Sequence, residues 1–205
     1  MMTDDEFDAA LVAAFFALMG EKGVLHATVP VAAGRAGLDL VAARRSGATM
    51  GSLVMKFGEL ADAYALTGAA SEGSVRDRLF DMMMRRFDFL QLHRAGVLAL
   101  LKYLPLDPAL ALCMAKASFC SMGWLLEAAG VPAAGPMGAV QQKGLLAVWA
   151  WGVRAWAKDE SADLTATMAA VDTARNRADQ LAARFCAPPA PMAAAPMPDA
   201  PPGVA

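Results

Sequence analysis

The residues in this sequence with the greatest potential for chemistry are two histidines and a short cluster of serine and cysteine. His26 falls in a predicted turn and His93 at a predicted helix start. Neither has a Ser or Cys nucleophile at a catalytic spacing, and the sequence has no glycine-rich phosphate loop. Ser118, Cys120 and Ser121 are most simply explained as residues of one helix. We therefore expect no enzyme and assign no catalytic residue.

The three cysteines are odd in number and lack the CxxC spacing of a metal or redox site. The sequence opens with acidic residues, whereas a signal peptide opens with a positive region, so we expect a cytoplasmic protein in a reducing compartment. Cys113, Cys120 and Cys186 should then be buried thiols. We expect no disulfide, no metal and no cofactor.

Basic side chains in the first third of the sequence are of the type that contacts nucleic-acid phosphates. Arg44 and Arg45 end a predicted short helix whose first half offers only Leu, Val and Ala to base edges. Up to residue 66 there are five basic and eight acidic residues, so an ordinary solvated face is an equal alternative. The candidate DNA contacts are Arg35, Arg44, Arg45 and Lys56.

Methionine and aromatic residues are concentrated between residues 82 and 156, a composition that suits an adaptable apolar pocket. The alternative is plain core packing at helical spacing. Trp149 and Trp151 cannot both face one core from the same helix, so one of them should face a partner or a ligand. The candidate ligand contacts are Met83, Phe87, Leu98, Leu101, Phe119, Met122, Trp124 and Trp149.

The composition indicates that helices position these side chains. The chain has 205 residues, of which 57% are hydrophobic, including 47 alanines and no isoleucine. Alanine favours helices and β-branched residues favour strands, so we predict an all-α protein. Although the mean hydropathy is +0.39, the longest uncharged apolar stretches are shorter than the ~20 residues of a membrane span, and no transmembrane segment is expected.

Apolar periodicity and capping residues set the expected helix boundaries. Thr3 and Glu6 have capping-box spacing, Thr28 and Asp39 suit N-caps, and Pro108 suits a first helical turn. Helices are expected at about 4–21, 29–35, 40–45, 49–66, 75–90, 95–104, 108–130, 139–158 and 161–185.

A break at residues 67–73 and a tail rich in proline divide the chain. We predict a first domain over 1–66 and a larger helical domain over 74–186. Residues 187–205 hold seven of the twelve prolines, with alanine and methionine as the main other residues. Such a segment cannot bury enough apolar surface to fold, and we expect it to be disordered.

The order of the first four helices, together with one short motif, resembles the TetR-type transcription regulators. The motif comprises Ala32 and Ala33, then Ala36, Gly37 and Leu38, which match the Ala-Gly-Val turn of that family. The resemblance implies a helix-turn-helix domain that binds operator DNA, followed by a ligand-binding and dimerisation domain. The run 39–45 lacks the aromatic residue and the lysine that contact phosphates in the family.

In TetR-like proteins the last two helices form a homodimer, and the resemblance implies the same here. Two long amphipathic helices at the end of the chain also have little else to cover. The alternative is packing within one subunit. The candidate dimer residues are Leu145, Gly152, Trp156, Met168, Val171 and Ala178.

The second segment also resembles a more particular family, the TetR-like lipid-binding accessory proteins of ubiquinone biosynthesis. The likeness covers most of 75–185, and its motifs are Arg85-Arg86-Phe87, His93-Arg94, Trp124, Lys143-Gly144-Leu145 and Trp156. It implies an isoprenoid-like ligand and a partner enzyme of quinone biosynthesis. We therefore hold two hypotheses: a regulator that responds to an apolar small molecule, and a lipid-binding accessory protein without DNA binding.

Overall fold

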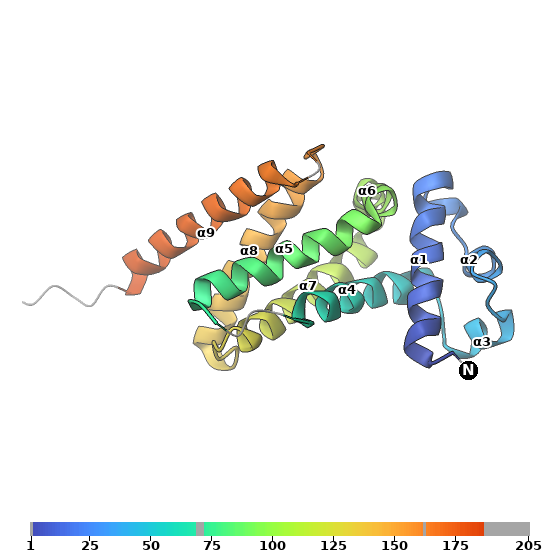
Figure 1. Ribbon diagram of the computed structural model, residues 1–205, viewed down its shortest axis with the longest axis horizontal. Helices are drawn as coiled ribbons and strands as arrows, with labels where there is room; N and C mark the ends of the chain where they lie inside the picture. The colour runs from blue at the N-terminus through green and yellow to red at the C-terminus, as the bar shows by residue number, and fades with distance from the viewer. Residues whose placement is uncertain (1, 69–71, 162, 187–205) are drawn as a thin grey trace, which may run out of the picture.

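The computed structural model describes residues 2–68, 72–161 and 163–186, with the side chains of the last helix described as far as Arg177. Every regular element within these residues is a helix, which confirms the all-α prediction (Figure 1). The elements are α1 (Asp4–Lys22), η1 (Val24–His26), α2 (Val29–Arg35), α3 (Leu40–Arg45), α4 (Met50–Leu66), α5 (Val75–Leu92), α6 (Arg94–Tyr103), η2 (Leu104–Leu106), α7 (Pro108–Ala128), α8 (Gly135–Trp156) and α9 (Thr165–Cys186).

Most predicted helix starts are confirmed by their capping hydrogen bonds. Thr3 and Glu6 form the predicted capping box of α1, and the Asp39 carboxylate accepts from two backbone N–H groups at the start of α3. Thr28 occupies the N-cap position of α2 but makes no side-chain capping bond. Helix α8 begins four residues earlier than expected, because Pro136 at its first turn already has the backbone φ of a helix.

Helices α2 and α3 are joined by a tight turn at one end of the molecule. Gly37 lies in this turn with φ 65°, a left-handed conformation that favours glycine. Ala32, Ala33 and Ala43 are fully buried, and these small side chains allow the two short helices to pack closely on the rest of the segment. The outward side of α3 carries Arg44 and other exposed residues.

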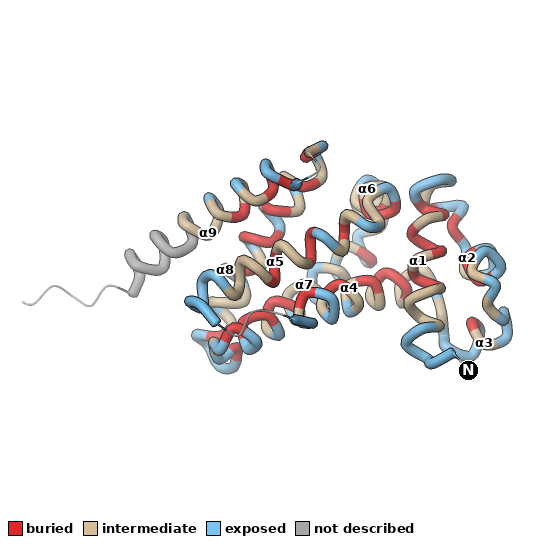
Figure 2. Tube along the Cα trace, in the orientation of Figure 1, coloured by how far each residue is buried: buried red, intermediate tan, exposed pale blue. Residues whose placement is uncertain are grey.

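Helix α1 crosses α6 at very short range, which ties the first segment to the second. A Cβ atom added to Gly96 would lie 2.2 Å from the carbonyl oxygen of Phe16, and one added to Gly20 would lie 2.7 Å from the Ala95 Cβ. The two helices therefore meet backbone to backbone. The buried residues of all the larger helices belong to one hydrophobic cluster that runs from Leu11 to Val171 (Figure 2).

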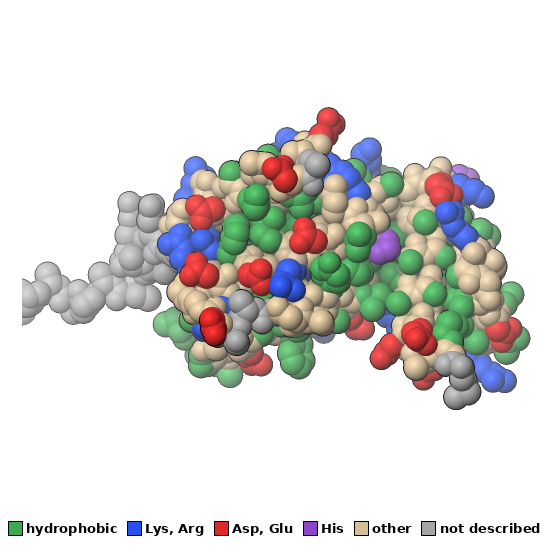
Figure 3. Space-filling view, viewed as in Figure 1, with side chains coloured by type: hydrophobic (Ala, Val, Ile, Leu, Met, Phe, Trp, Pro, Cys, Tyr) green, Lys and Arg blue, Asp and Glu red, His purple; other side chains and the backbone are tan. Residues whose placement is uncertain are grey.

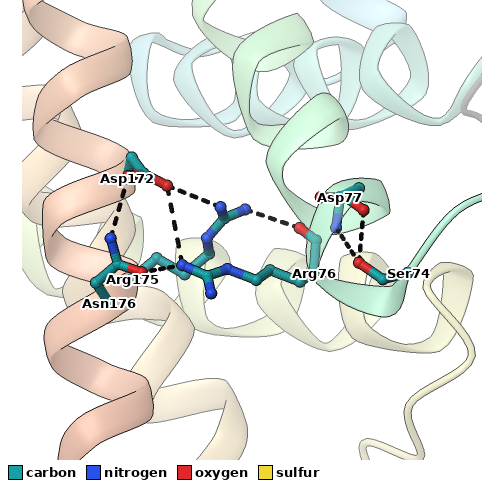
Figure 4. Close-up of polar contacts among 6 residues, drawn as sticks. All are labelled: Ser74, Arg76, Asp77, Asp172, Arg175 and Asn176. Atoms are coloured by element: carbon teal, nitrogen blue, oxygen red, sulfur yellow. Dashed lines mark hydrogen bonds and ion pairs between the residues drawn. The ribbon is translucent and has the colours of Figure 1, made fainter.

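Helix α9 packs along α8 and is pinned to the start of α5 by polar contacts (Figure 4). The Arg175 guanidinium donates to the Arg76 carbonyl oxygen (2.8 Å) and to Asp172 Oδ1 (2.9 Å). Arg76 forms an ion pair with Asp172 at 3.9 Å and donates a hydrogen bond to Asn176. One face of α9 is thus already occupied within the subunit.

The turn between α8 and α9 is organised by one buried carboxylate. Asp159 Oδ1 accepts from the Ser161 backbone N–H and hydroxyl, while Oδ2 accepts from the Thr167 backbone N–H and hydroxyl. These bonds hold the pKa of Asp159 far below its usual value, with the Ser161 hydroxyl the largest cause. They also delay the start of α9 to Thr165, four residues later than expected.

Helix α7 has a long apolar surface that the sequence analysis underestimated. It is the one helix among the described residues that is long and apolar enough to cross a membrane by length and composition, and 28% of its most apolar window is buried. Lys116 interrupts the apolar run of α7, so neither uncharged stretch of this helix reaches the length of a membrane span. Cys113 and Cys120 lie exposed on this helix, so the expectation that they are buried was wrong. The side chain of Cys186 lies outside the described ones.

Candidate functional site

Two adjoining pockets open between helix α4, at the end of the first segment, and helices of the second segment. The first, which we call the α7 pocket, has a volume of about 470 Å³ and lies between α4 and α7. The second, the α8 pocket, has a volume of about 420 Å³ and reaches from α4 to α6 and α8. Both volumes fall in the range of small-molecule sites. The residues shared by the two linings are Val54, Gly58, Arg86, Met114 and Ser118.

The α8 pocket is almost entirely apolar. Among the described residues, Arg86 and Ser118 supply its only polar side chains. Trp149 forms part of the wall, and its ring stacks on the Phe87 ring with the centroids 4.6 Å apart. A pocket of this kind binds a largely apolar molecule and fixes its orientation at one polar point.

The polar point of the pockets is an ion pair between α5 and α4, in which Arg86 lines both pockets and Asp62 lines the α7 pocket. Arg86 is 4% exposed, and its Nη1 lies 3.1 Å from Asp62 Oδ1. Asp62 Oδ2 accepts a hydrogen bond of 2.5 Å from the Ser121 hydroxyl on α7. The Arg86 guanidinium carbon also lies 4.4 Å from the centre of the Trp149 ring, a cation–π distance.

This ion pair leaves several hydrogen-bonding atoms unused. Within the described residues, Arg86 Nε has no acceptor, and Arg86 Nη1 and Asp62 Oδ1 face each other at 3.1 Å without meeting hydrogen-bond geometry. Burial lowers the pKa of Arg86 and raises the pKa of Asp62, although each opposite charge counteracts the shift of the other. Both directions express the cost of removing the two charges from water.

An aromatic cluster connects the α8 pocket to the first segment. Phe57 of α4 lines the pocket, and its ring stacks on Phe16 of α1 with the centroids 3.9 Å apart. Phe89 and His93 complete the cluster at 5.1 and 5.5 Å from Phe57. Burial lowers the pKa of His93, because the charged form of the imidazole is disfavoured in this apolar cluster.

The structure brings three of the eight predicted ligand contacts to the pockets. Leu101 and Trp149 line the α8 pocket, and Trp124 lines the α7 pocket while remaining 64% exposed. The other five are absent from both linings: Met83, Phe87 and Met122 are buried in the core, and Leu98 and Phe119 are half-buried. For Met83, Phe87, Met122 and Leu98 the alternative interpretation, core packing, fits the observed positions.

Sequence reasoning missed the polar centre of the pockets. Arg86 was noted only as part of a motif, and Asp62 only in the count of acidic residues. A signal was present, because Arg86 lies three residues after the buried Met83 and four before the buried Leu90, on the apolar face of α5. A charged residue in the middle of such a face indicates a buried ion pair.

The four predicted DNA contacts divide into two kinds. Arg35 donates two hydrogen bonds to the Glu21 carboxylate, at 2.6 and 2.7 Å, and Lys56 forms an ion pair with Asp8. These two side chains therefore hold α2 and α4 to α1. Arg44 and Arg45 are exposed on α3.

Acidic side chains also lie at this end of the molecule (Figure 3). The first turn of α1 carries Asp4, Asp5 and Glu6, and Figure 1 places the start of α1 at the same end as α3. In Figure 3 acidic side chains are gathered beside the basic ones there. The first half of α3 presents Leu40 and Val41, which are 51% and 57% exposed.

The predicted dimer residues lie mainly inside the subunit. Leu145, Trp156 and Val171 are buried, and a Cβ at Gly152 would lie 2.7 Å from the Phe87 ring. Gly152 lies against Phe87 of α5 and Val171 of α9, and Trp156 donates to Gln91 of α5, so a second copy would have to be held by other residues. Met168 is half-buried, and Ala178 lies outside the described side chains.

The outward surfaces of α7 and α8 carry most of the large exposed apolar side chains described in this segment. Trp151 is 49% exposed whereas Trp149 is buried, which confirms that the two tryptophans face different surroundings. The other large exposed apolar side chains on these helices are Leu112, Trp124, Met137 and Val140.

The chain was compared with known proteins at the levels of family, sequence and structure. No protein-family model, no curated protein and no solved structure matches it. The function of the chain is therefore inferred from the pockets and the helices around them.

Proposed function

We propose that this chain is a ligand-responsive transcription regulator that binds an apolar small molecule in the α7 and α8 pockets. The observation that carries the proposal is the double role of α4. This helix follows directly after α3, and its Val54 and Gly58 line both pockets. A molecule in the pockets therefore touches α4, which directly follows α3, the helix that carries the candidate DNA contacts Arg44 and Arg45.

The mechanism is a shift in the position of α4 relative to α1. Phe57 has one contact in the α8 pocket and another with the Phe16 ring of α1. A ligand that packs against Phe57 favours one arrangement of this contact over another, and its binding energy shifts the population accordingly. In a TetR-like homodimer such a shift changes the separation of two DNA-reading heads.

DNA binding has a direct test in its salt dependence. Each phosphate contact adds about 0.9 to the slope of log affinity against log salt. For DNA from upstream of its own gene, we expect tight binding at low salt and a slope reduced by about 2 per subunit in Arg44→Ala/Arg45→Ala. The charge-matched control, Lys102→Ala/Lys158→Ala, changes two exposed lysines of the second segment and should leave the slope unchanged. No binding to this DNA even at low salt would refute the regulator.

A second candidate is a lipid-binding accessory protein without DNA binding, acting with an enzyme of quinone biosynthesis. Exposed Leu40 and Val41 favour it, because these side chains offer no hydrogen bond to a base edge. The acidic first turn of α1 favours it as well, since negative charge repels DNA phosphates. Absence of DNA binding together with ligand binding in the pockets would support this candidate.

A further inference from the structure

We propose that the pockets select an uncharged amphiphile whose head group both accepts and donates hydrogen bonds, such as a long-chain alcohol. This inference rests on the proposed ligand-binding function and specifies its ligand class. It derives from Arg86, which lines both pockets, and from its ion-pair partner Asp62, which lines the α7 pocket.

The unused atoms of the ion pair define the hydrogen bonds that the head group must make. Arg86 Nε is a donor without an acceptor, and the contact of 3.1 Å between Arg86 Nη1 and Asp62 Oδ1 does not meet hydrogen-bond geometry. A buried polar group without a partner is costly, so a ligand that supplies the missing partner gains binding energy. A hydroxyl group can do both, because its oxygen accepts from the guanidinium while its O–H donates to the carboxylate.

The charge balance of the site excludes a strongly charged head. Arg86 and Asp62 carry opposite charges 3.1 Å apart, and the α7 pocket adds one acid, Glu59, and one base, Lys116. An anionic head beside Arg86 would also lie beside Asp62 and be repelled. A cationic head beside Asp62 would also lie beside Arg86 and be repelled. A neutral head therefore fits best.

The remainder of the ligand is set by the α8 pocket. Its volume of about 420 Å³ is lined by aliphatic and aromatic side chains such as Leu101, Leu104 and Val153. An alkyl chain fills such a space without unpaired polar atoms. The head at Arg86 and the chain toward α6 together define an amphiphile with one polar end.

The test uses probes of nearly equal size. 1-Octanol and 1-methoxyheptane are isomers, but only the alcohol can donate a hydrogen bond, and octanoate adds a negative charge. Calorimetric titration should give 1-octanol an affinity about tenfold higher than either other probe, the value of one hydrogen bond to a charged group.

The variants separate the head-group claim from the pocket itself. Removal of one partner alone would leave the other charge buried and unpaired, so Arg86→Met is combined with Asp62→Leu, a replacement of the whole pair that such sites tolerate. In this double variant the affinities of the two isomers, 1-octanol and 1-methoxyheptane, should agree to within about twofold. Arg85→Met changes the neighbouring arginine, which bonds to Asp81 and to the Thr67 carbonyl, and should keep the preference for the alcohol.

Each outcome has a distinct meaning. Equal affinity of the wild type for the two isomers, or a preference for octanoate, would overturn the head-group inference while leaving the pocket intact. A preference for the alcohol that survives in the double variant would also overturn it. Binding of none of the probes would refute the proposed ligand-binding function, and this inference with it.

Discussion

The most informative single residues in this protein are charged side chains that the fold has buried. Arg86 and Asp62 stand 24 positions apart in the sequence and form a pair only because α4 and α5 pack side by side. Capping residues such as Thr3 could be predicted, since their effect depends on neighbours three positions away. The partner of a buried charge depends on tertiary packing, which the spacing of residues along one helix does not contain.

Asp159 provides a prediction at the residue scale. Its pKa lies below the unfolded value of about 3.9, so its stabilising effect is full above that value and is lost as the pH falls through the lower pKa of the folded state. We expect Asp159→Asn to reduce the free energy of unfolding by about 2 kcal/mol at pH 7, because four hydrogen bonds to a buried carboxylate are weakened.

Urea titrations between pH 7 and pH 3 check the Asp159 prediction. The difference between wild type and Asp159→Asn should shrink as the pH falls below about 4. Glu160→Gln is the control, since this neighbouring side chain is exposed and should alter stability little. A constant difference across the pH range would show that the ionised carboxylate is not what stabilises the turn.

The extents of the helices follow from sequence patterns, whereas their mutual contacts do not. Nearly all helix boundaries agree with the prediction, since periodicity and caps are local properties. The pocket wall was less predictable: Leu101 and Trp149 line it, but Met83 and Phe87 point into the core. An apolar residue on an amphipathic helix looks the same in sequence whether it borders a cavity or fills the interior.

The close crossing of α1 and α6 gives a prediction at the scale of elements. Gly96→Ala places a methyl group against the backbone of Phe16, and we expect the free energy of unfolding to fall by about 1–3 kcal/mol through overpacking. Gly34→Ala is the matched control, because no atom lies within 4 Å of the added Cβ and alanine favours the helix. Equal stability of both variants in urea titrations would mean that α1 and α6 do not meet backbone to backbone.

At the scale of the whole molecule, the first segment and the pockets are linked through α4 and the aromatic cluster. The high hydrophobic content of the chain is divided between helix-forming alanine, the core and exposed apolar surfaces on α7 and α8. The sequence indicated a concentration of apolar residues in the second segment. It did not indicate that α4, a helix of the first segment, would form a wall of both pockets.

The measurement that tests the central claim most directly is native mass spectrometry of variants that fill the pockets. Gly58 lines both pockets, and no atom lies within 4 Å of a Cβ added there. Gly58→Leu therefore extends a side chain into the ligand space. Gly51→Leu is the matched control on the same helix, since Gly51 also has open space at its Cβ and belongs to neither lining.

The same spectra report the number of subunits, which tests the predicted homodimer. We predict one apolar ligand per subunit on the wild type and on Gly51→Leu, either retained through purification or taken up from added 1-octanol, and none on Gly58→Leu. Equal ligand occupancy of Gly58→Leu and wild type, or a wild type that carries no ligand under either condition, would contradict the claim that the pockets are the functional site.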